Sequence, residues 1–71
     1  MQQRLMFTVV SASNGWQLYE GDQGREWFAS RYEAVETADL IAMSLHTQHG
    51  IPTGVLMDMA GSESVMLVCH G

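Results

Sequence analysis

The pattern of apolar and polar positions predicts three short β-strands in the first part of the chain. Residues 5–10 form an apolar run rich in strand-forming side chains, and residues 16–20 alternate between apolar and polar positions. Residues 25–29 predict a third, shorter strand. The segments between them, 11–15 and 21–24, are rich in glycine and small polar residues, so each is expected to form a turn.

A helix is predicted next, and separate signals mark its two ends. Ser30 is a favourable N-cap residue, and Glu33 stands at the capping-box spacing, where each side chain binds a free backbone N–H of the first turn. Gly50 and Pro52 end the segment, because glycine adopts the left-handed conformation easily and proline cannot continue a helix. The helix therefore has about 18 residues and a length of about 27 Å. The face predicted to pack on the strands is made of Ala34, Val35, Ala38, Ile41, Ala42 and Leu45.

Two further strands are predicted after the helix, over residues 55–60 and 64–69, with a turn at 61–63. The order along the chain is strand–strand–strand–helix–strand–strand, with no internal repeat or linker. We therefore predict a single α+β domain over residues 1–71. It consists of an antiparallel sheet of four to five strands with one helix packed on one face.

The charge balance restricts what the surface can bind. The chain has eight acidic residues, three arginines and no lysine, for a formal net charge of −5. Residues 32–71 hold five of the acidic residues and no basic residue apart from histidine. Proteins that bind DNA or RNA neutralise phosphates with lysine and arginine, so direct nucleic-acid binding is not expected. An acidic surface favours a basic protein partner, or it only keeps the protein soluble.

The sequence also predicts a cytoplasmic location. A single cysteine, Cys69, permits no intrachain disulfide, which fits a reducing compartment. The chain contains no apolar run of about 18 or more residues that would span a bilayer. Its first residues lack the basic start and the long apolar core of a signal peptide.

Part of the chain resembles a bacterial domain family of unknown function. The residues that carry the resemblance are Trp16, Leu18, Glu20, Gly21, Phe28, Ser30, Glu33, Ala34, Ala38 and Ala42. The family pattern is W-x-V-x-x-E-G, a gap, and then F-x-T-x-x-E-A with alanines at every fourth position; here Glu20 lies one residue closer to the tryptophan. The resemblance implies a sheet covered by one helix and implies no activity.

The chain is also similar in type to small acidic proteins encoded by phages, which include inhibitors of host RNA polymerase and anti-CRISPR proteins. The shared properties are size, acidity, the lack of lysine, the lack of catalytic residues and a strand–strand–helix–strand order. This similarity implies a protein that binds and blocks a host complex.

Histidine and cysteine side chains are the candidates for metal binding or catalysis. His46 and His49 lie near the predicted helix end, Cys69 is the last residue of the last predicted strand, and His70 follows it. Imidazole and thiolate ligate zinc, but this spacing matches no structural zinc site, and adjacent strand residues point to opposite faces. A catalytic cysteine would need an oriented base and an oxyanion site, of which the sequence gives no sign. We expect no metal, no cofactor and no enzymatic activity.

Two surfaces are candidates for binding a protein. On the side of the predicted helix away from the sheet, acidic residues surround two large apolar side chains, an arrangement that resembles many interfaces. The candidate partner-binding residues are Glu33, Glu36, Asp39, Leu40 and Met43. The alternative is a solvated acidic face. The second candidate is the face of the sheet that one helix cannot cover. Met57 and Met59, or the apolar run 65–69, would form an exposed apolar surface there and favour a dimer or a protein partner. The alternative is that these side chains fill the core.

We therefore expect a non-enzymatic acidic protein-binding module. Its partner would be a basic surface of a nucleic-acid-handling complex, which a phage-type, anti-CRISPR-like inhibitor would block. Eight acidic residues are few for a mimic of the phosphates of duplex DNA, so we expect the protein to block one local site rather than to imitate a long stretch of DNA. The alternative is a small structural homo-oligomer, such as a homodimer, without a ligand.

Overall fold

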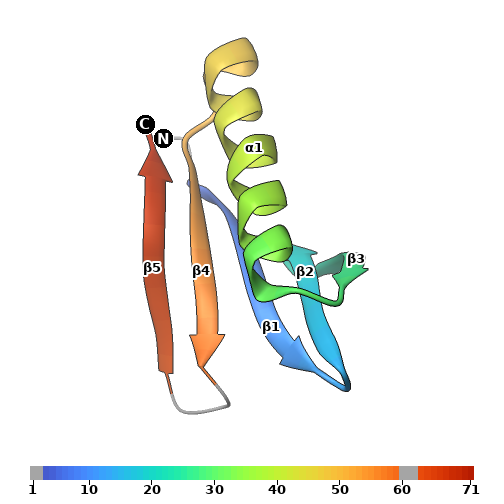
Figure 1. The fold of residues 1–71 in the computed structure, drawn as a ribbon. Coiled ribbons are helices and arrows are strands. Elements are labelled where there is room, and N and C mark those ends of the chain that lie inside the picture. The colour runs from blue at the N-terminus through green and yellow to red at the C-terminus, as the bar shows by residue number, and fades with distance from the viewer. Residues whose placement is uncertain (1–2, 60–62) are drawn as a thin grey trace.

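The structure is a computed structural model that describes residues 3–59 and 63–71. One helix lies along one face of a five-stranded sheet (Figure 1), as the sequence predicts. The elements are β1 (Leu5–Ala12), β2 (Gly15–Glu20), β3 (Gln23–Phe28), α1 (Arg31–His49), β4 (Thr53–Met59) and β5 (Glu63–His70). The predicted order of elements is confirmed. Ala60, Gly61 and Ser62, which belong to the predicted fourth strand and the following turn, lie outside the described residues.

The sheet is mixed, and this corrects the expected antiparallel arrangement at one position. Its strand order is β3-β2-β1-β4-β5, and β1 pairs with β4 in parallel, from Leu5 opposite Thr53 to Val10 opposite Asp58. The other three pairs are antiparallel. The physical reason is the helix. After the first three strands, α1 carries the chain back across the sheet, so that β4 enters beside β1 and runs in the same direction.

Local signals determine both ends of α1. The Oγ of Ser30 accepts a hydrogen bond from the backbone N–H of Glu33 at 3.4 Å, which is one half of the expected capping box. At the other end, Gly50 has a left-handed backbone with φ 69°, and its N–H donates to the carbonyl of His46 at 2.9 Å. The predicted helix boundaries are therefore confirmed.

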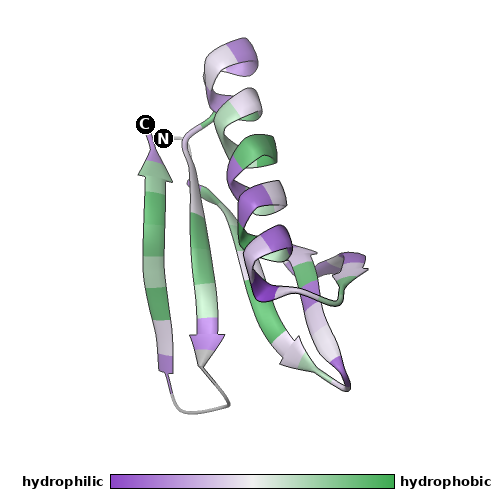
Figure 2. Cartoon of the chain, viewed as in Figure 1, coloured by the Kyte–Doolittle hydropathy of each residue, from purple (hydrophilic) through white to green (hydrophobic). Residues whose placement is uncertain are grey.

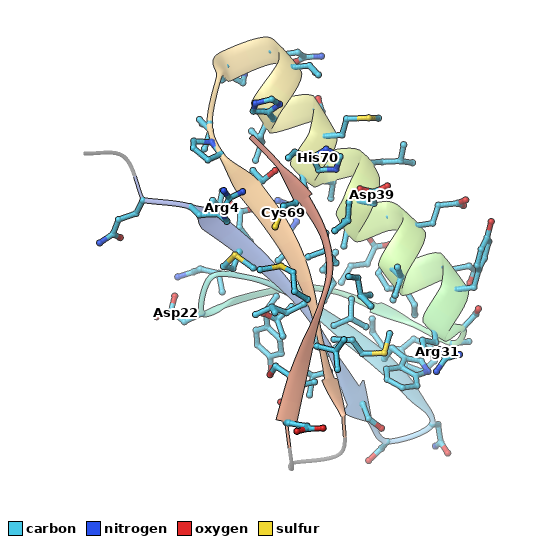
Figure 3. The ribbon with its side chains drawn as sticks, turned by 90° about the vertical axis from the view of Figure 1, so that its left-hand side faces the viewer. Arg4, Asp22, Arg31, Asp39, Cys69 and His70 are labelled. Atoms are coloured by element: carbon cyan, nitrogen blue, oxygen red, sulfur yellow. The ribbon has the colours of Figure 1, made fainter. Side chains whose placement is uncertain are left out.

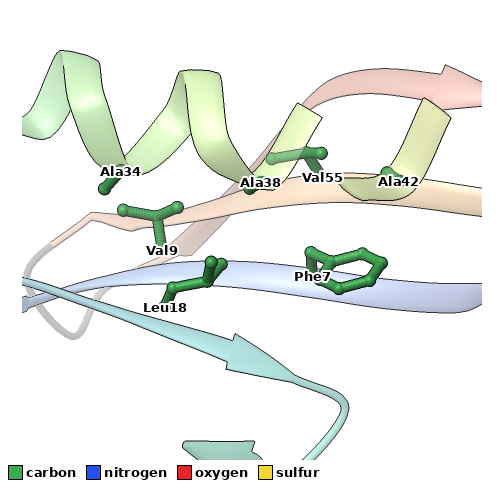
Figure 4. Packing of buried hydrophobic residues seen from close by; sticks show 7 residues of the cluster. All are labelled: Phe7, Val9, Leu18, Ala34, Ala38, Ala42 and Val55. Atoms are coloured by element: carbon green, nitrogen blue, oxygen red, sulfur yellow. The ribbon is translucent and has the colours of Figure 1, made fainter. Parts of the chain in front are cut away.

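Small side chains bring α1 close to the sheet. Ala34, Ala38 and Ala42 are fully buried, and Figure 4 shows them above the side chains of the central strands. Below them lie the buried side chains of Phe7, Val9, Leu18 and Val55. Close packing of this kind excludes water from both surfaces and supplies most of the stability of a small domain. Val35, Ile41 and Leu45, also predicted for this face, pack partly buried around the cluster.

A buried hydrogen bond fixes the register between α1 and β4. Thr53 is fully buried, and its Oγ1 donates to the carbonyl oxygen of Ala42 at 2.8 Å. A buried hydroxyl without a partner would be costly, so this bond favours one position of the helix along the sheet.

Hydrophobic residues are also found away from the helix-covered core. Figure 2 shows hydrophobic segments along β1, β4 and β5, while hydrophilic and hydrophobic residues alternate along α1. The edge strand β5 carries three exposed apolar residues in succession, Val65, Met66 and Leu67. The other edge strand, β3, exposes Trp27, whereas Phe28 packs against the core, so these two side chains take opposite faces of the sheet.

Candidate protein-binding groove

A groove runs between α1 and the edge strand β5. One hollow of this groove has a volume of about 280 Å³ and is lined by Tyr32, Val35, Glu36, Asp39, Leu67 and Val68. A second hollow of about 360 Å³ shares three of these residues and adds Arg31 and Met57. Because the two hollows share Tyr32, Val35 and Leu67, we describe them together as the α1–β5 groove.

An irregularity in strand pairing shapes the strand wall of this groove. Val68 pairs with Val55 and Met66 pairs with Leu56, so Leu67 is an extra residue in β5. A β-bulge of this kind redirects the side chains on either side of the extra residue. As a result, the adjacent residues Leu67 and Val68 both line the groove.

The helix wall of the groove is polar and acidic. The phenol of Tyr32 donates a hydrogen bond to Oε2 of Glu36 at 2.9 Å. This bond, together with the negative charge of Glu36, raises the pKa of Tyr32 above its ordinary value. The groove therefore has an apolar floor and strand wall, opposite a wall that carries the carboxylates of Glu36 and Asp39.

Asp39 also connects the helix to β5. Its Oδ1 lies 2.7 Å from Nε2 of His70, and Figure 3 shows the two side chains facing each other between α1 and β5. The His70 side chain is 19% exposed and the Asp39 side chain 42% exposed, so the carboxylate still reaches solvent. This contact closes one end of the groove.

The five residues predicted as a partner site do not all lie on the same surface of the molecule. Glu33, Glu36, Leu40 and Met43 are exposed on the side of α1 away from the sheet, which we call the outer helix surface. Leu40 is 56% exposed and Met43 is 40% exposed, large values for apolar side chains. Asp39 is instead turned toward β5, where it binds His70. Glu36 belongs to both surfaces, because it also lines the groove.

Sequence reasoning missed the groove residues Tyr32, Leu67 and Val68. The apolar run 65–69 did indicate that both faces of the last strand are apolar. No sequence pattern indicates the bulge at Leu67 or the position of β5 beside α1, because both depend on the pairing of distant segments.

The histidine and cysteine candidates are spread over different sites. His70 faces α1, whereas Cys69 is exposed and lies on the side of β5 away from the helix (Figure 3). Within residues 3–59 and 63–71, no group of three or more histidine, cysteine, aspartate or glutamate side chains is arranged to hold a metal ion.

Comparison with family models, with curated proteins and with solved structures finds no match to this chain. In the part of the chain that the structure describes, no helix combines the length and the apolar character needed to cross a membrane.

Proposed function

We propose that this chain is a protein-binding module that receives a basic and partly apolar segment of a partner on the outer helix surface and the adjoining α1–β5 groove. The observation that carries the proposal is the juxtaposition of exposed Leu40 and Met43 with the acidic wall of an apolar groove. Exposed apolar side chains rimmed by charged ones are typical of protein interfaces.

The distribution of charge supports a basic partner. Among the described residues of the outer helix surface and the first hollow, Glu33, Glu36 and Asp39 carry negative charge, and Arg31 lines the second hollow. Two other arginines are already engaged elsewhere: Arg25 pairs with Glu20, and Arg4 donates to main-chain carbonyls. Complementary charge speeds the encounter with a basic surface and selects against acidic partners.

This surface suits an inhibitor of a nucleic-acid-handling protein. Arginine and lysine that normally contact phosphate would instead meet Glu33 and Glu36, while an apolar side chain of the partner would enter the groove. The more specific form of the proposal is a phage-type, anti-CRISPR-like inhibitor. The small size of the two hollows of the groove, about 280 Å³ and about 360 Å³, favours blocking of one local site.

Site-specific crosslinking tests the proposal. A photo-reactive amino acid at Leu40 is expected to crosslink one specific protein in a lysate of the source cell, whereas the same group at Gln23 in β3 is not. Glu36→Lys in the Leu40-labelled chain is expected to abolish this product, and raised salt is expected to weaken it. Asp22→Lys is the matched control, because it makes the same change of charge in the β2–β3 turn, away from α1 (Figure 3).

Equal crosslinking by the Glu36→Lys and Asp22→Lys chains would contradict the proposed site. Asp39 is less suitable for charge reversal, because a lysine there would also remove the contact with His70 and disturb β5. Asp39→Asn keeps a hydrogen-bonding group and removes only the charge, so it tests the electrostatic contribution of this position.

A homo-oligomer is the second candidate function, and the edge strand β5 favours it. Val65, Met66 and Leu67 are exposed on a strand that pairs on one side only, with β4. An unpaired apolar edge of this kind readily accepts another strand. Light scattering coupled to size-exclusion chromatography should then give a dimer that Val65→Lys converts to a monomer. A monomer at every concentration would contradict this candidate and leave the first one intact.

A further inference from the structure

Three neighbouring strands place sulphur-containing side chains around one glycine on the sheet face away from α1. Met6 of β1 is the register partner of Gly54 in β4, and Gly54 is in turn the partner of Cys69 in β5. These three positions form one row across the sheet. Met66 lies on the same face of β5 as Cys69, because it pairs with Leu56 beyond the bulge.

The thioethers of Met6 and Met66 both lie over Gly54. A Cβ atom added at Gly54 would lie 3.1 Å from the Sδ of Met6 and 3.4 Å from the Sδ of Met66. The two sulphur atoms therefore approach the same point, which a side chain at position 54 would occupy. Directly opposite Cβ positions on antiparallel strands are about 4.5–5.5 Å apart, so the side chain of Cys69 begins beside this point.

Hydrogen bonds from the Arg4 side chain to main-chain carbonyls hold together the strand ends near the three sulphur-containing residues. Arg4, which precedes β1, donates from one guanidinium nitrogen to the carbonyl of Thr53 at 2.7 Å and from another to the carbonyl of Gly71 at 2.9 Å. These bonds join residues that lie within two positions of Met6, Gly54 and Cys69 in the sequence. Two of the three residues also reach solvent, because Cys69 is an exposed free cysteine and Met66 is 48% exposed.

We propose that Met6, Met66 and Cys69 form a binding site for a soft monovalent metal ion, Cu(I). Thiolate and thioether ligands select Cu(I), whereas hard cations such as Mg²⁺ and Ca²⁺ require oxygen ligands, which this set does not supply. On binding, a Cu–S bond replaces the S–H bond of Cys69 and the proton passes to the buffer, while the two thioethers bind without losing a proton. The copper remains Cu(I), so no oxidant or reductant is consumed. Because Gly54 has no side chain, the two methionine side chains can lie directly over its backbone, where a Cβ would come within 2.9 Å of the Cε of Met6.

Anaerobic titration with Cu(I) alone, in competition with a chromophoric Cu(I) chelator, tests this site. The unmodified chain is expected to withdraw one equivalent of Cu(I) from the chelator. Cys69→Ser, Met6→Leu and Met66→Leu are each expected to weaken binding by about tenfold or more, since the loss of even an indirect metal contact often costs about 10–100-fold. Leucine keeps most of the volume of methionine, so these variants should fold, which circular dichroism will verify.

Met43→Leu is the matched control, because Met43 is an exposed methionine on the outer helix surface, and its variant is expected to bind Cu(I) like the unmodified chain. If Met6→Leu and Met66→Leu bind as tightly as Met43→Leu, the cysteine acts alone and the site is refuted. Failure of the unmodified chain to compete with the chelator refutes it as well. Neither result affects the proposed protein-binding surface, which is formed by α1 and by the groove between α1 and β5.

Discussion

The imidazole Nε2 of His70 lies 2.7 Å from Oδ1 of Asp39, and this contact joins the last strand of the sheet to the middle of the helix. The helix also packs on the central strands through its alanines, but β5 is an edge strand that pairs only with β4. The Asp39–His70 pair therefore anchors the strand wall of the groove to its helix wall. Both side chains are partly exposed, which limits the strength of the pair.

The first prediction concerns the energy of this pair. Asp39→Ala and His70→Ala should each lower the free energy of unfolding by about 0.5–1 kcal/mol, and the double variant by less than their sum, because both remove the same bond. Urea denaturation of the unmodified chain, the two single variants and the double variant measures the coupling energy between Asp39 and His70. His49→Ala, at the exposed end of α1, is the control and should change stability by less than about 0.5 kcal/mol. Strict additivity would show that the pair contributes nothing.

The second prediction concerns the close approach of helix and sheet. Ala38 is fully buried in the middle of α1, so Ala38→Leu should push the helix away from the strands and destabilise the fold by about 1–3 kcal/mol or more. Leu40→Ala on the outer helix surface should change stability by less than about 0.5 kcal/mol, because Leu40 is 56% exposed. Thermal unfolding followed by circular dichroism compares the two. Similar melting temperatures would mean that the alanine face does not control packing.

The third prediction concerns the ionisation of Tyr32. Its hydrogen bond to Glu36 and the charge of that carboxylate raise its pKa, so Glu36→Gln should lower this pKa toward the ordinary value. Absorbance titration near the tyrosinate band measures the change, and Tyr32→Phe identifies which transition belongs to Tyr32.

The same contact predicts how stability depends on pH. The neutral phenol is the favoured form in the folded chain, so the contribution of the contact is complete below the unfolded pKa of about 10. It is lost as the pH rises through the higher pKa of folded Tyr32. Stability should therefore fall less steeply in this alkaline range in the Glu36→Gln chain. An unchanged tyrosine transition in that chain would contradict the role of Glu36.

The fourth prediction compares two glycines of the first hairpins. A Cβ at Gly15 would lie 2.4 Å from the carbonyl oxygen of Phe28 and 2.3 Å from the ring of Trp27, whereas a Cβ at Gly24 would meet only side-chain atoms at 3.7 Å. Gly15→Ala should therefore displace β3 and destabilise the fold by about 1–3 kcal/mol, with a change in tryptophan fluorescence as Trp27 moves. Gly24→Ala should be close to neutral. Equal effects of the two changes would mean that β3 adapts without cost.

Local signals in the sequence were sufficient for the helix and the order of elements. Ser30 and Gly50 act on the backbone within one turn of the helix, and Ala34, Ala38 and Ala42 mark the packing face by their spacing alone. The strands were recognised by their apolar runs, although β3 begins and ends earlier than predicted. These features depend on residues that are close in the chain, so they can be read directly from it.

The pairing of segments that are distant in the sequence could not be predicted in the same way. The apolar pattern of 5–10 is equally compatible with a parallel or an antiparallel neighbour, so it did not indicate that β4 runs parallel to β1. Asp39 and His70 are far apart in the sequence, and neither position alone indicates the contact. The outer helix surface was predictable from helical spacing, whereas the groove beside it required the bulge at Leu67.

The parallel pair of β1 and β4 has a consequence for how the protein is made. β1 lies at the centre of the sheet, and one of its two neighbours is formed by residues 53–59. As the chain leaves the ribosome, the hairpin of β1 and β2 forms first, but the apolar side of Phe7 and Val9 has no cover until α1 and β4 follow. Contacts between such distant segments form slowly. Folding must therefore be completed late, and a nascent chain stalled before β4 would offer its central strand to any chaperone or neighbouring strand within reach.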